Sequence, residues 1–230
     1  MAKVNIKINN IPVVVEEGVS ILEAARMAGI NIPTLCYLKG LTKSGACRVC
    51  LVEVKNARSL VASCVYPVSE GLEVFTHSEK ALNGRRNSVE LIMSNHNKNC
   101  LSCKRNQNCE LQALTQELGV RENKYEGAYT PRTFDDVAPG IVRDTSKCVL
   151  CGRCVDTCKK VQGIGVLGFE NRGFKTVVGP AFNASFADVN CMQCGQCVIN
   201  CPVGALTEKE AIHDVVNALN DPTKFVVVQT

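Results

Sequence analysis

The sequence contains one cysteine pattern twice, as Cys148-Val-Leu-Cys151-Gly-Arg-Cys154-Val-Asp-Thr-Cys158 and as Cys191-Met-Gln-Cys194-Gly-Gln-Cys197-Val-Ile-Asn-Cys201-Pro202. Both runs have the spacing C-x2-C-x2-C-x3-C, so they form an internal repeat. Gly152 and Gly195 occupy the same place in each copy, where a side chain would crowd whatever the cysteines bind. Zinc usually takes its cysteines in more widely spaced pairs. The density of each run therefore favours an iron-sulfur cluster over a pair of zinc knuckles.

The repeated run resembles that of two-cluster bacterial-type ferredoxins, in which three cysteines hold one 4Fe-4S cluster and the fourth reaches the other cluster. The resemblance implies one cluster on Cys148, Cys151, Cys154 and Cys201. It implies a twin cluster on Cys191, Cys194, Cys197 and Cys158. Lys159 follows Cys158 where the motif usually has proline, so we expect a more relaxed turn there without the loss of a ligand.

Length and composition set the class of protein. The 230 residues include 15 cysteines and no tryptophan, and the cysteine grouping favours three small domains. No charged-then-apolar leader begins the chain, and no run of about 18 apolar residues follows, so we expect a cytoplasmic protein without a membrane-spanning segment. This many cysteines without secretion indicate metal in a reducing, anaerobic cytoplasm.

The formal net charge of +4 does not indicate nucleic-acid binding. Four clusters with their thiolates would bring the charge to about −3. No run of Lys and Arg and no basic helix stands out. We therefore expect no nucleic-acid partner.

Residues 3–76 are predicted to form a small β-rich domain. Val4 to Ile8 alternates in polarity, Asn9-Asn10 turns, and Ile11 to Val15 returns, which predicts a hairpin. Ser20 followed by Glu23 has the pattern of a capping box, and Gly29 would end the helix that it opens. Further strands are expected over residues 49–55 and 60–65.

Four cysteines lie in this first domain, at Cys36, Cys47, Cys50 and Cys64. A hairpin, a helix, a cysteine-bearing loop and further strands follow the order of a β-grasp ferredoxin, and this resemblance implies a 2Fe-2S cluster. The plant-type spacing is C-x4-C-x2-C, whereas ten residues separate Cys36 from Cys47 here. The first ligand would therefore arrive by a longer loop. A zinc site with the same four ligands is the alternative.

Residues 78–119 are predicted to form two helices around a third cysteine group. Ser78 would cap a helix that reaches Met93, and a second helix would carry Leu111, Leu114 and Leu118. The segment between them supplies three cysteines and a nearby histidine, namely His96, Cys100, Cys103 and Cys109.

Three cysteines cannot complete a 4Fe-4S cluster, so His96 is predicted as the fourth ligand. Fifteen cysteines and one histidine make sixteen ligands, four for each of four clusters. A neutral imidazole is an ordinary iron ligand, and it should raise the reduction potential relative to a fourth thiolate. His77 and His213 have no cysteines at ligand spacing, and we interpret them as surface or packing residues.

The remaining segments are predicted from turn residues and periodicity. Residues 120–147 would form a polar connection. Residues 165–169 and 173–178 would form a short hairpin that turns at Asn171 and Gly173 and covers a cluster edge. Thr207 to Ala218 would form a helix that ends at Asp221-Pro222. Lys224 to Thr230 has the pattern of a buried strand, which would need neighbouring strands that this sequence does not contain.

The order of these groups resembles the amino-terminal electron-transfer region of iron-only (FeFe) hydrogenases, especially the multi-subunit, NAD(P)-linked enzymes. The resemblance covers essentially the whole chain. It implies an α+β architecture with these parts: a β-grasp 2Fe-2S ferredoxin domain over 1–77, a small helical 4Fe-4S segment with one histidine and three cysteines over 78–120, a linker over 121–147, a two-cluster 4Fe-4S ferredoxin-like domain over 148–209, and the start of a following catalytic domain over 210–230.

The implied function is an electron relay through one 2Fe-2S and three 4Fe-4S clusters, with the hydrogen-activating site outside this chain. Implied partners are flavin- and NAD(P)-binding subunits, other iron-sulfur subunits, or ferredoxin. The alternative is the equivalent region of an NAD-linked formate dehydrogenase or a complex I-like oxidoreductase, because the same histidine-cysteine segment occurs there. No residue is placed for acid-base or nucleophilic catalysis, and no glycine loop for a nucleotide is found.

Overall fold

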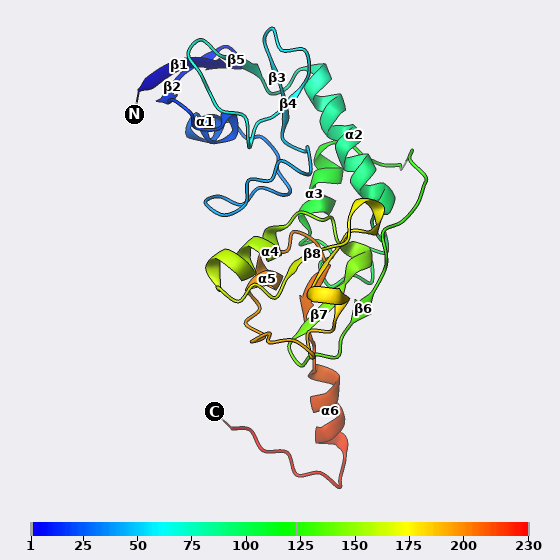
Figure 1. Cartoon of the computed structure of the whole chain (residues 1–230). Coiled ribbons are helices and arrows are strands. Elements are labelled where there is room, and N and C mark those ends of the chain that lie inside the picture. The colour runs from blue at the N-terminus through cyan, green and yellow to red at the C-terminus, as the bar shows by residue number, and fades with distance from the viewer. Residues whose placement is uncertain (1, 123, 230) are drawn as a thin grey trace.

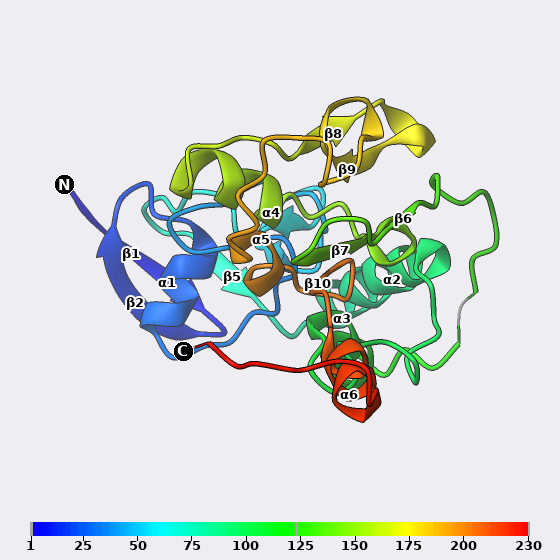
Figure 2. The ribbon, with the colours of Figure 1, turned by 90° about the horizontal axis from the view of Figure 1, so that it is seen from below.

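The computed structural model describes residues 2–122 and 124–229 and has a five-stranded sheet at one end and two small sheets in its middle (Figure 1). Helix α2 (Glu79–Asn95) leads from the large sheet to the middle of the molecule, and helix α6 (Ile212–Asn220) lies at the opposite end. Seen from below, the large sheet lies to one side of the two small sheets (Figure 2).

The large sheet is built on the predicted hairpin. Strands β1 (Lys3–Ile8) and β2 (Ile11–Glu16) pair antiparallel, and Asn9 and Asn10 both take positive φ angles, as a type I′ turn requires. The strand order is β2-β1-β5-β3-β4, where β5 (Glu73–Phe75) is parallel to β1. Alternate residues of β1 are buried, so one face covers the core. The β-grasp prediction is confirmed.

Helix α1 (Ile21–Met27) packs on this sheet and buries Ile21, Leu22, Ala24 and Ala25. The Ser20 hydroxyl accepts a hydrogen bond from the Glu23 amide at 3.3 Å, as predicted. The Glu23 carboxylate accepts from the Tyr37 hydroxyl and so contributes to the packing of the cysteine loop.

Strands β3 (Leu51–Val54) and β4 (Val61–Ala62) are shorter than predicted. The flanking residues Cys50 and Cys64 leave the sheet geometry because the cysteine loops need turns there. Helix α2 packs on β3 through Gly84, whose added Cβ would lie 2.6 Å from Leu60 Cδ1 and 3.2 Å from Leu51 Cδ1. The absent side chain therefore lets the helix backbone approach the sheet closely.

The two predicted helices of the middle segment are present. Ser78 caps α2 by accepting from the Ala81 amide at 3.2 Å. Helix α3 (Glu110–Glu117) buries Leu111 and Leu114, and its C-cap Leu118 is also buried. Their apolar side chains join one hydrophobic core with the residues of the repeated cysteine runs.

A three-stranded sheet supports the repeated runs, and it alters two predictions. Strands β6 (Phe134–Asp135) and β7 (Ile141–Asp144) form within the expected polar connection, and β10 (Leu206–Glu208) pairs with β7. The expected helix start at Thr207 is therefore wrong. Leu206 is buried against the core and β7 needs an antiparallel partner, so this segment becomes a strand.

The two copies of the run have the same backbone conformation around their second and third cysteines. Helix α4 (Arg153–Asp156) follows Gly152, and helix α5 (Gln196–Ile199) follows Gly195. Because Lys159 replaces proline, α4 continues as a π-turn, η2 (Thr157–Val161), whereas Pro202 follows the second copy. The predicted hairpin is present as β8 (Gly168–Glu170) and β9 (Val177–Gly179). Three single 3-10 turns complete this unit: η1 (Thr145–Lys147), η3 (Gly173–Lys175) and η4 (Ala181–Asn183).

Helix α6 and the segment after it extend away from the rest of the chain (Figure 1). The predicted strand over 224–230 is wrong for its described residues 224–229, which form no regular element there. Phe225 is 94% exposed, because no strand among residues 2–122 and 124–229 pairs with this segment. Across residues 2–122 and 124–229, every helix is too short or too polar to cross a bilayer.

Candidate metal centres

The structure brings the four cysteines of the first domain together. The Cys36 thiol contacts those of Cys47 and Cys64, and the Cys50 thiol contacts that of Cys64. Cys36, Cys47 and Cys50 lie on loops before β3, and Cys64 lies in the turn two residues after the end of β4. Ser63 fixes this corner, because its hydroxyl donates to the Cys50 carbonyl at 2.8 Å.

These thiols lie close enough to hydrogen-bond to one another. Hydrogen bonds from neighbouring thiols lower the pKa of Cys36 and lower that of Cys50 to about 6. The same contacts raise the pKa of Cys47 and of Cys64. Such mutual contact is what four ligands of one small cluster require, since they must converge as thiolates.

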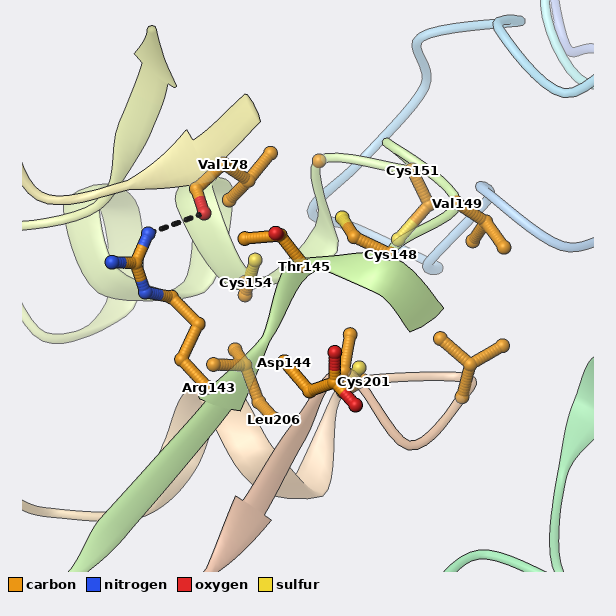
Figure 3. A pocket seen from close by; sticks show the side chains of 13 residues that line it. Arg143, Asp144, Thr145, Cys148, Val149, Cys151, Cys154, Val178, Cys201 and Leu206 are labelled. Carbon is orange, nitrogen blue, oxygen red and sulfur yellow. Dashed lines mark hydrogen bonds between the residues drawn. The ribbon is translucent and has the colours of Figure 1, made fainter. Parts of the chain in front are cut away.

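Two pockets in the repeat unit are each lined by four cysteines. The first pocket has Cys148, Cys151, Cys154 and Cys201 in its wall, and their side chains surround one space (Figure 3). The second pocket has Cys158, Cys191, Cys194 and Cys197 in its wall. Each pocket therefore takes three cysteines from one run and the fourth from the other. The ligand sets themselves stay a prediction.

Residues between the cysteines of both runs have positive φ angles, in the left-handed region of the backbone. Leu150 and Gln193, at the same place in the two copies, have φ angles of 52° and 53°, and Gly152 and Gly195 have 77° and 71°. A left-handed angle is costly for leucine and glutamine. Here it turns amides toward sulfur, since the Leu150 amide donates to Cys148 Sγ at 3.4 Å. Such N–H to sulfur contacts stabilise thiolate ligands.

The buried thiols need a positive partner to ionise. Burial raises the pKa of Cys148 to about 12, that of Cys151 to about 11 and that of Cys197 to about 12. Burial also raises the pKa of Cys154 well above its ordinary value. Bound iron reverses this effect, because a coordinating thiol is deprotonated. The all-sulfur donor set in apolar walls therefore fits iron-sulfur clusters.

The third cysteine group lies between α2 and α3. Cys100 and Cys103 both interact electrostatically with Cys109, whose pKa is raised by burial. His96 is the C-cap residue of α2. The charged groups that act on its ring are Lys147 and Asp144. Ligation by His96 stays a prediction.

The imidazole of His96 nevertheless has the properties of a ligand. Burial, followed by the Lys147 cation, lowers its pKa to about 4, so the ring is neutral at pH 7. Its Nδ1 atom is buried and has no hydrogen-bond partner among the described residues. A buried ring nitrogen without a partner is costly and calls for an explanation. A metal at this nitrogen would supply one.

Within residues 2–122 and 124–229, no three His, Cys, Asp or Glu side chains converge closely enough to hold a single metal ion. The cysteines instead contact one another in pairs in the first domain and surround pockets in the repeat unit.

The four groups are neighbours. Cys36 interacts electrostatically with Cys151, and Cys154 interacts with Cys197. Cys47 and Cys148 line one further pocket between the first domain and the repeat unit. The third group adjoins the same unit, because the Glu110 amide donates to the Pro202 carbonyl at 2.9 Å.

Three buried arginines lie beside these groups, and the sequence analysis did not single them out. Arg153 makes a bidentate ion pair with Glu110, at 2.6 and 2.9 Å. Arg143 donates to Asn183 Oδ1 at 2.7 Å. Arg85 lies on the buried face of α2. For Arg85 the sequence does contain a signal. The residue lies four positions after Ala81 and four before Val89, which places a cation on the apolar face of the predicted helix.

Gly204 allows the third group to approach the repeat unit. An added Cβ there would lie 2.6 Å from Cys103 Sγ. In a chain without clusters the thiol could rotate away, but a thiol bound to iron could not. Gly204→Ala is therefore expected to cost about 1–3 kcal/mol of stability in the loaded protein and to lower the iron content.

The measurement is iron per chain together with thermal unfolding, before and after cluster loading. Gly127→Ala is the matched control, because nothing lies within 4 Å of a Cβ at Gly127. Equal iron content in Gly204→Ala and Gly127→Ala would contradict the expectation.

The fold and the cysteine-lined pockets define an iron-sulfur protein of the electron-transfer type. Family models agree with this class. They match as a 2Fe-2S iron-sulfur cluster binding domain over residues 1–79, an NADH-ubiquinone oxidoreductase-G iron-sulfur binding region over 85–124, and a 4Fe-4S dicluster domain over 147–205.

A solved structure of an NAD+-reducing [NiFe]-hydrogenase in the H2-reduced state contains a chain with the same fold. The TM-score is 0.83 at 31% identity, over 91% of this chain and 89% of that one. The chain therefore belongs to the family of this hydrogenase chain, the iron-sulfur electron-transfer proteins with the NADH-ubiquinone oxidoreductase-G type of cluster-binding region.

Curated relatives are longer, and the chain spans less than half of each. It is 46% identical to the NADP-reducing hydrogenase subunit HndD of Solidesulfovibrio fructosivorans, over 100% of this chain and 40% of that protein. It is 34% identical to the NADPH-Fe(3+) oxidoreductase subunit alpha of Geobacter sulfurreducens, over 90% of this chain and 24% of that protein. It is 34% identical to the mitochondrial NADH-ubiquinone oxidoreductase 78 kDa subunit of Candida albicans, over 91% and 29%.

Proposed function

We propose that this chain is the electron relay of an iron-only hydrogenase that works with NAD(P) or ferredoxin. The relay has one 2Fe-2S cluster and three 4Fe-4S clusters. Its ligands are the four sets predicted from the sequence: Cys36, Cys47, Cys50, Cys64; His96, Cys100, Cys103, Cys109; Cys148, Cys151, Cys154, Cys201; and Cys191, Cys194, Cys197, Cys158. The proposed parts are 1–77, 78–120, 121–147, 148–209 and 210–230, and strands β6 and β7 of the third part pair into the sheet of the fourth.

The contiguity of the four groups carries the proposal of a relay, and the 46% identity to HndD over 100% of this chain favours a hydrogenase. Tunnelling rates fall steeply with distance, so a relay needs neighbouring clusters. The Cys36 and Cys151 groups interact, as do the Cys154 and Cys197 groups. The clusters held by these residues would supply one-electron chemistry, in which one cluster is oxidised as the next is reduced. The protein supplies placement, exclusion of water and tuning of each potential.

The groups suggest a branched order. The first-domain cluster and the His96 cluster both adjoin the first pocket of the repeat unit, which makes them two entry points for electrons from partner subunits. The cluster of Cys158, Cys191, Cys194 and Cys197 then comes last. We propose that flavin- and NAD(P)-binding subunits meet the entry points, in the cytoplasm.

Iron and acid-labile sulfide per chain, measured on anaerobically prepared protein, test the relay. The proposal expects about 14 of each. A zinc scaffold would contain neither and would be colourless. A count for only two clusters would contradict the relay.

A second candidate is the same region of a complex I-like or formate dehydrogenase-type oxidoreductase. The 34% identity to the NADH-ubiquinone oxidoreductase 78 kDa subunit favours it specifically. Whether the natural gene continues past Thr230, and with which motifs, separates the two candidates. Cysteine motifs for a di-iron cofactor would support the hydrogenase, and a molybdenum-pterin domain would support the alternative.

A further inference from the structure

Arg85 is a buried cation with no role in the proposed relay so far. It is 2% exposed and lies on the face of α2 that also buries Ala81 and Val89. Its Nε donates to the Leu51 carbonyl at 2.8 Å. One terminal nitrogen, Nη2, is buried and has no hydrogen-bond partner in the part of the chain that the structure describes.

The packing of α2 places this side chain beside the 2Fe-2S ligands. Gly84 brings the helix close to Leu51 and Leu60, and Leu51 directly follows Cys50 (Figure 1 shows α2 beside β3 and β4). Burial lowers the pKa of Arg85, and electrostatic interactions with Cys50 and Glu117 oppose that effect. Cys50 is therefore within electrostatic range of the guanidinium.

A buried guanidinium without a counter-ion is expensive. The other two buried arginines have strong partners, since Arg153 pairs with Glu110 and Arg143 donates to Asn183. Among the described residues, Arg85 makes no ion pair within 4.0 Å. Glu117, the carboxylate that interacts with it, is exposed, so water screens that interaction. The other group that interacts electrostatically with Arg85 is Cys50.

We propose that Arg85 is the counter-charge of the 2Fe-2S cluster and raises the reduction potential of that cluster. The inference rests on the proposed ligand set of Cys36, Cys47, Cys50 and Cys64. A 2Fe-2S core with four thiolates is an anion, and reduction adds one more negative charge. A nearby buried cation stabilises the reduced state more than the oxidised one, because the interaction grows with the charge and is poorly screened. Arg85 is thus a positioning and tuning residue that binds no iron.

The test is a redox titration of the loaded chain, followed by electron paramagnetic resonance at temperatures where the 2Fe-2S signal persists and those of 4Fe-4S clusters relax. Arg85→Met keeps the apolar stem and removes the charge. We expect a roughly tenfold lower equilibrium constant for one-electron reduction of this cluster, a shift of about 59 mV to lower potential. The three other potentials should move less.

Two variants separate charge from packing. Arg85→Lys keeps a cation at this position, because the adjacent anionic cluster would favour the protonated ammonium, and it should stay nearer the wild-type potential than Arg85→Met. Arg86→Met is the matched control, because Arg86 neighbours Arg85 but donates to the Leu118 carbonyl at 3.1 Å and is partly exposed. If the Arg85→Met variant does not bind its clusters, Arg85→Gln replaces it, and the 2Fe-2S potential is again expected to fall.

The inference is overturned if the 2Fe-2S signal is present and the charge-removing variant leaves its potential unchanged. It is also overturned if Arg85→Lys shifts the potential as much as Arg85→Met, since packing would then be the cause. A wild-type chain without any 2Fe-2S signal would instead contradict the proposed function, so the two failures are distinguishable.

Discussion

Replacing Cys158 by alanine is expected to destroy the cluster of the second run, although every residue of that run remains. Cys158 belongs to the first run, but it lines the pocket that contains Cys191, Cys194 and Cys197. Loss of one thiolate leaves a 4Fe-4S cluster with three ligands. We expect the loaded chain to lose up to about four of its roughly 14 irons.

Double variants identify which cluster is lost. Two substitutions in one site should lose no more iron than a single substitution there, whereas the iron losses from substitutions in different sites should add. Cys158→Ala with Cys191→Ala is therefore expected to match Cys158→Ala alone, and Cys158→Ala with Cys148→Ala to lose a second cluster. The reverse result, with Cys158 grouped with Cys148, would show that the two runs do not exchange their fourth cysteines.

His96→Ala is expected to remove or convert the cluster of Cys100, Cys103 and Cys109, because the fourth ligand is lost. His96→Cys should instead retain the cluster and lower its reduction potential, on the order of 100 mV, because a thiolate adds a negative charge. The measurements are iron per chain and a redox titration that follows each cluster signal.

The other two histidines provide matched controls. The His77 Nδ1 atom already lies 2.7 Å from the Thr76 hydroxyl, and His213 is exposed on α6. His77→Ala and His213→Ala should retain all four clusters. If His96→Ala behaves as these controls do, the third 4Fe-4S cluster either is absent or uses another ligand, and the relay loses one entry point.

Local patterns predicted the elements whose stability is local. The hairpin at Asn9-Asn10 and the helix caps at Ser20 and Ser78 were predicted because turn and cap chemistry acts within a few residues. Strand β10 was missed, since only its pairing with β7, more than sixty residues earlier, makes Leu206 to Glu208 extended. Tertiary pairing there outweighed a helix-like sequence.

The cysteines of the candidate sites were predictable, while their surroundings were not. Repeat spacing grouped the cysteines of the two runs, because it is a property of the chain alone. Arg85 and the Arg153 to Glu110 pair join segments that are separate in the sequence. Only the packing of α2 and α3 brings these charges to the clusters, so no short motif contained them.

The π-turn at Thr157 to Val161 also connects the repeat unit to the first domain. It extends the first run to Lys160, whose ammonium donates to the Leu41 carbonyl of the first domain at 3.1 Å and pairs with Asp156 at 2.8 Å. The Lys160 contact and helix α2 therefore connect the first domain to the repeat unit at two places. If electrons pass between the two units as proposed, the contacts at both places keep the distance between them short without a domain movement, and we expect the rate to be independent of solvent viscosity.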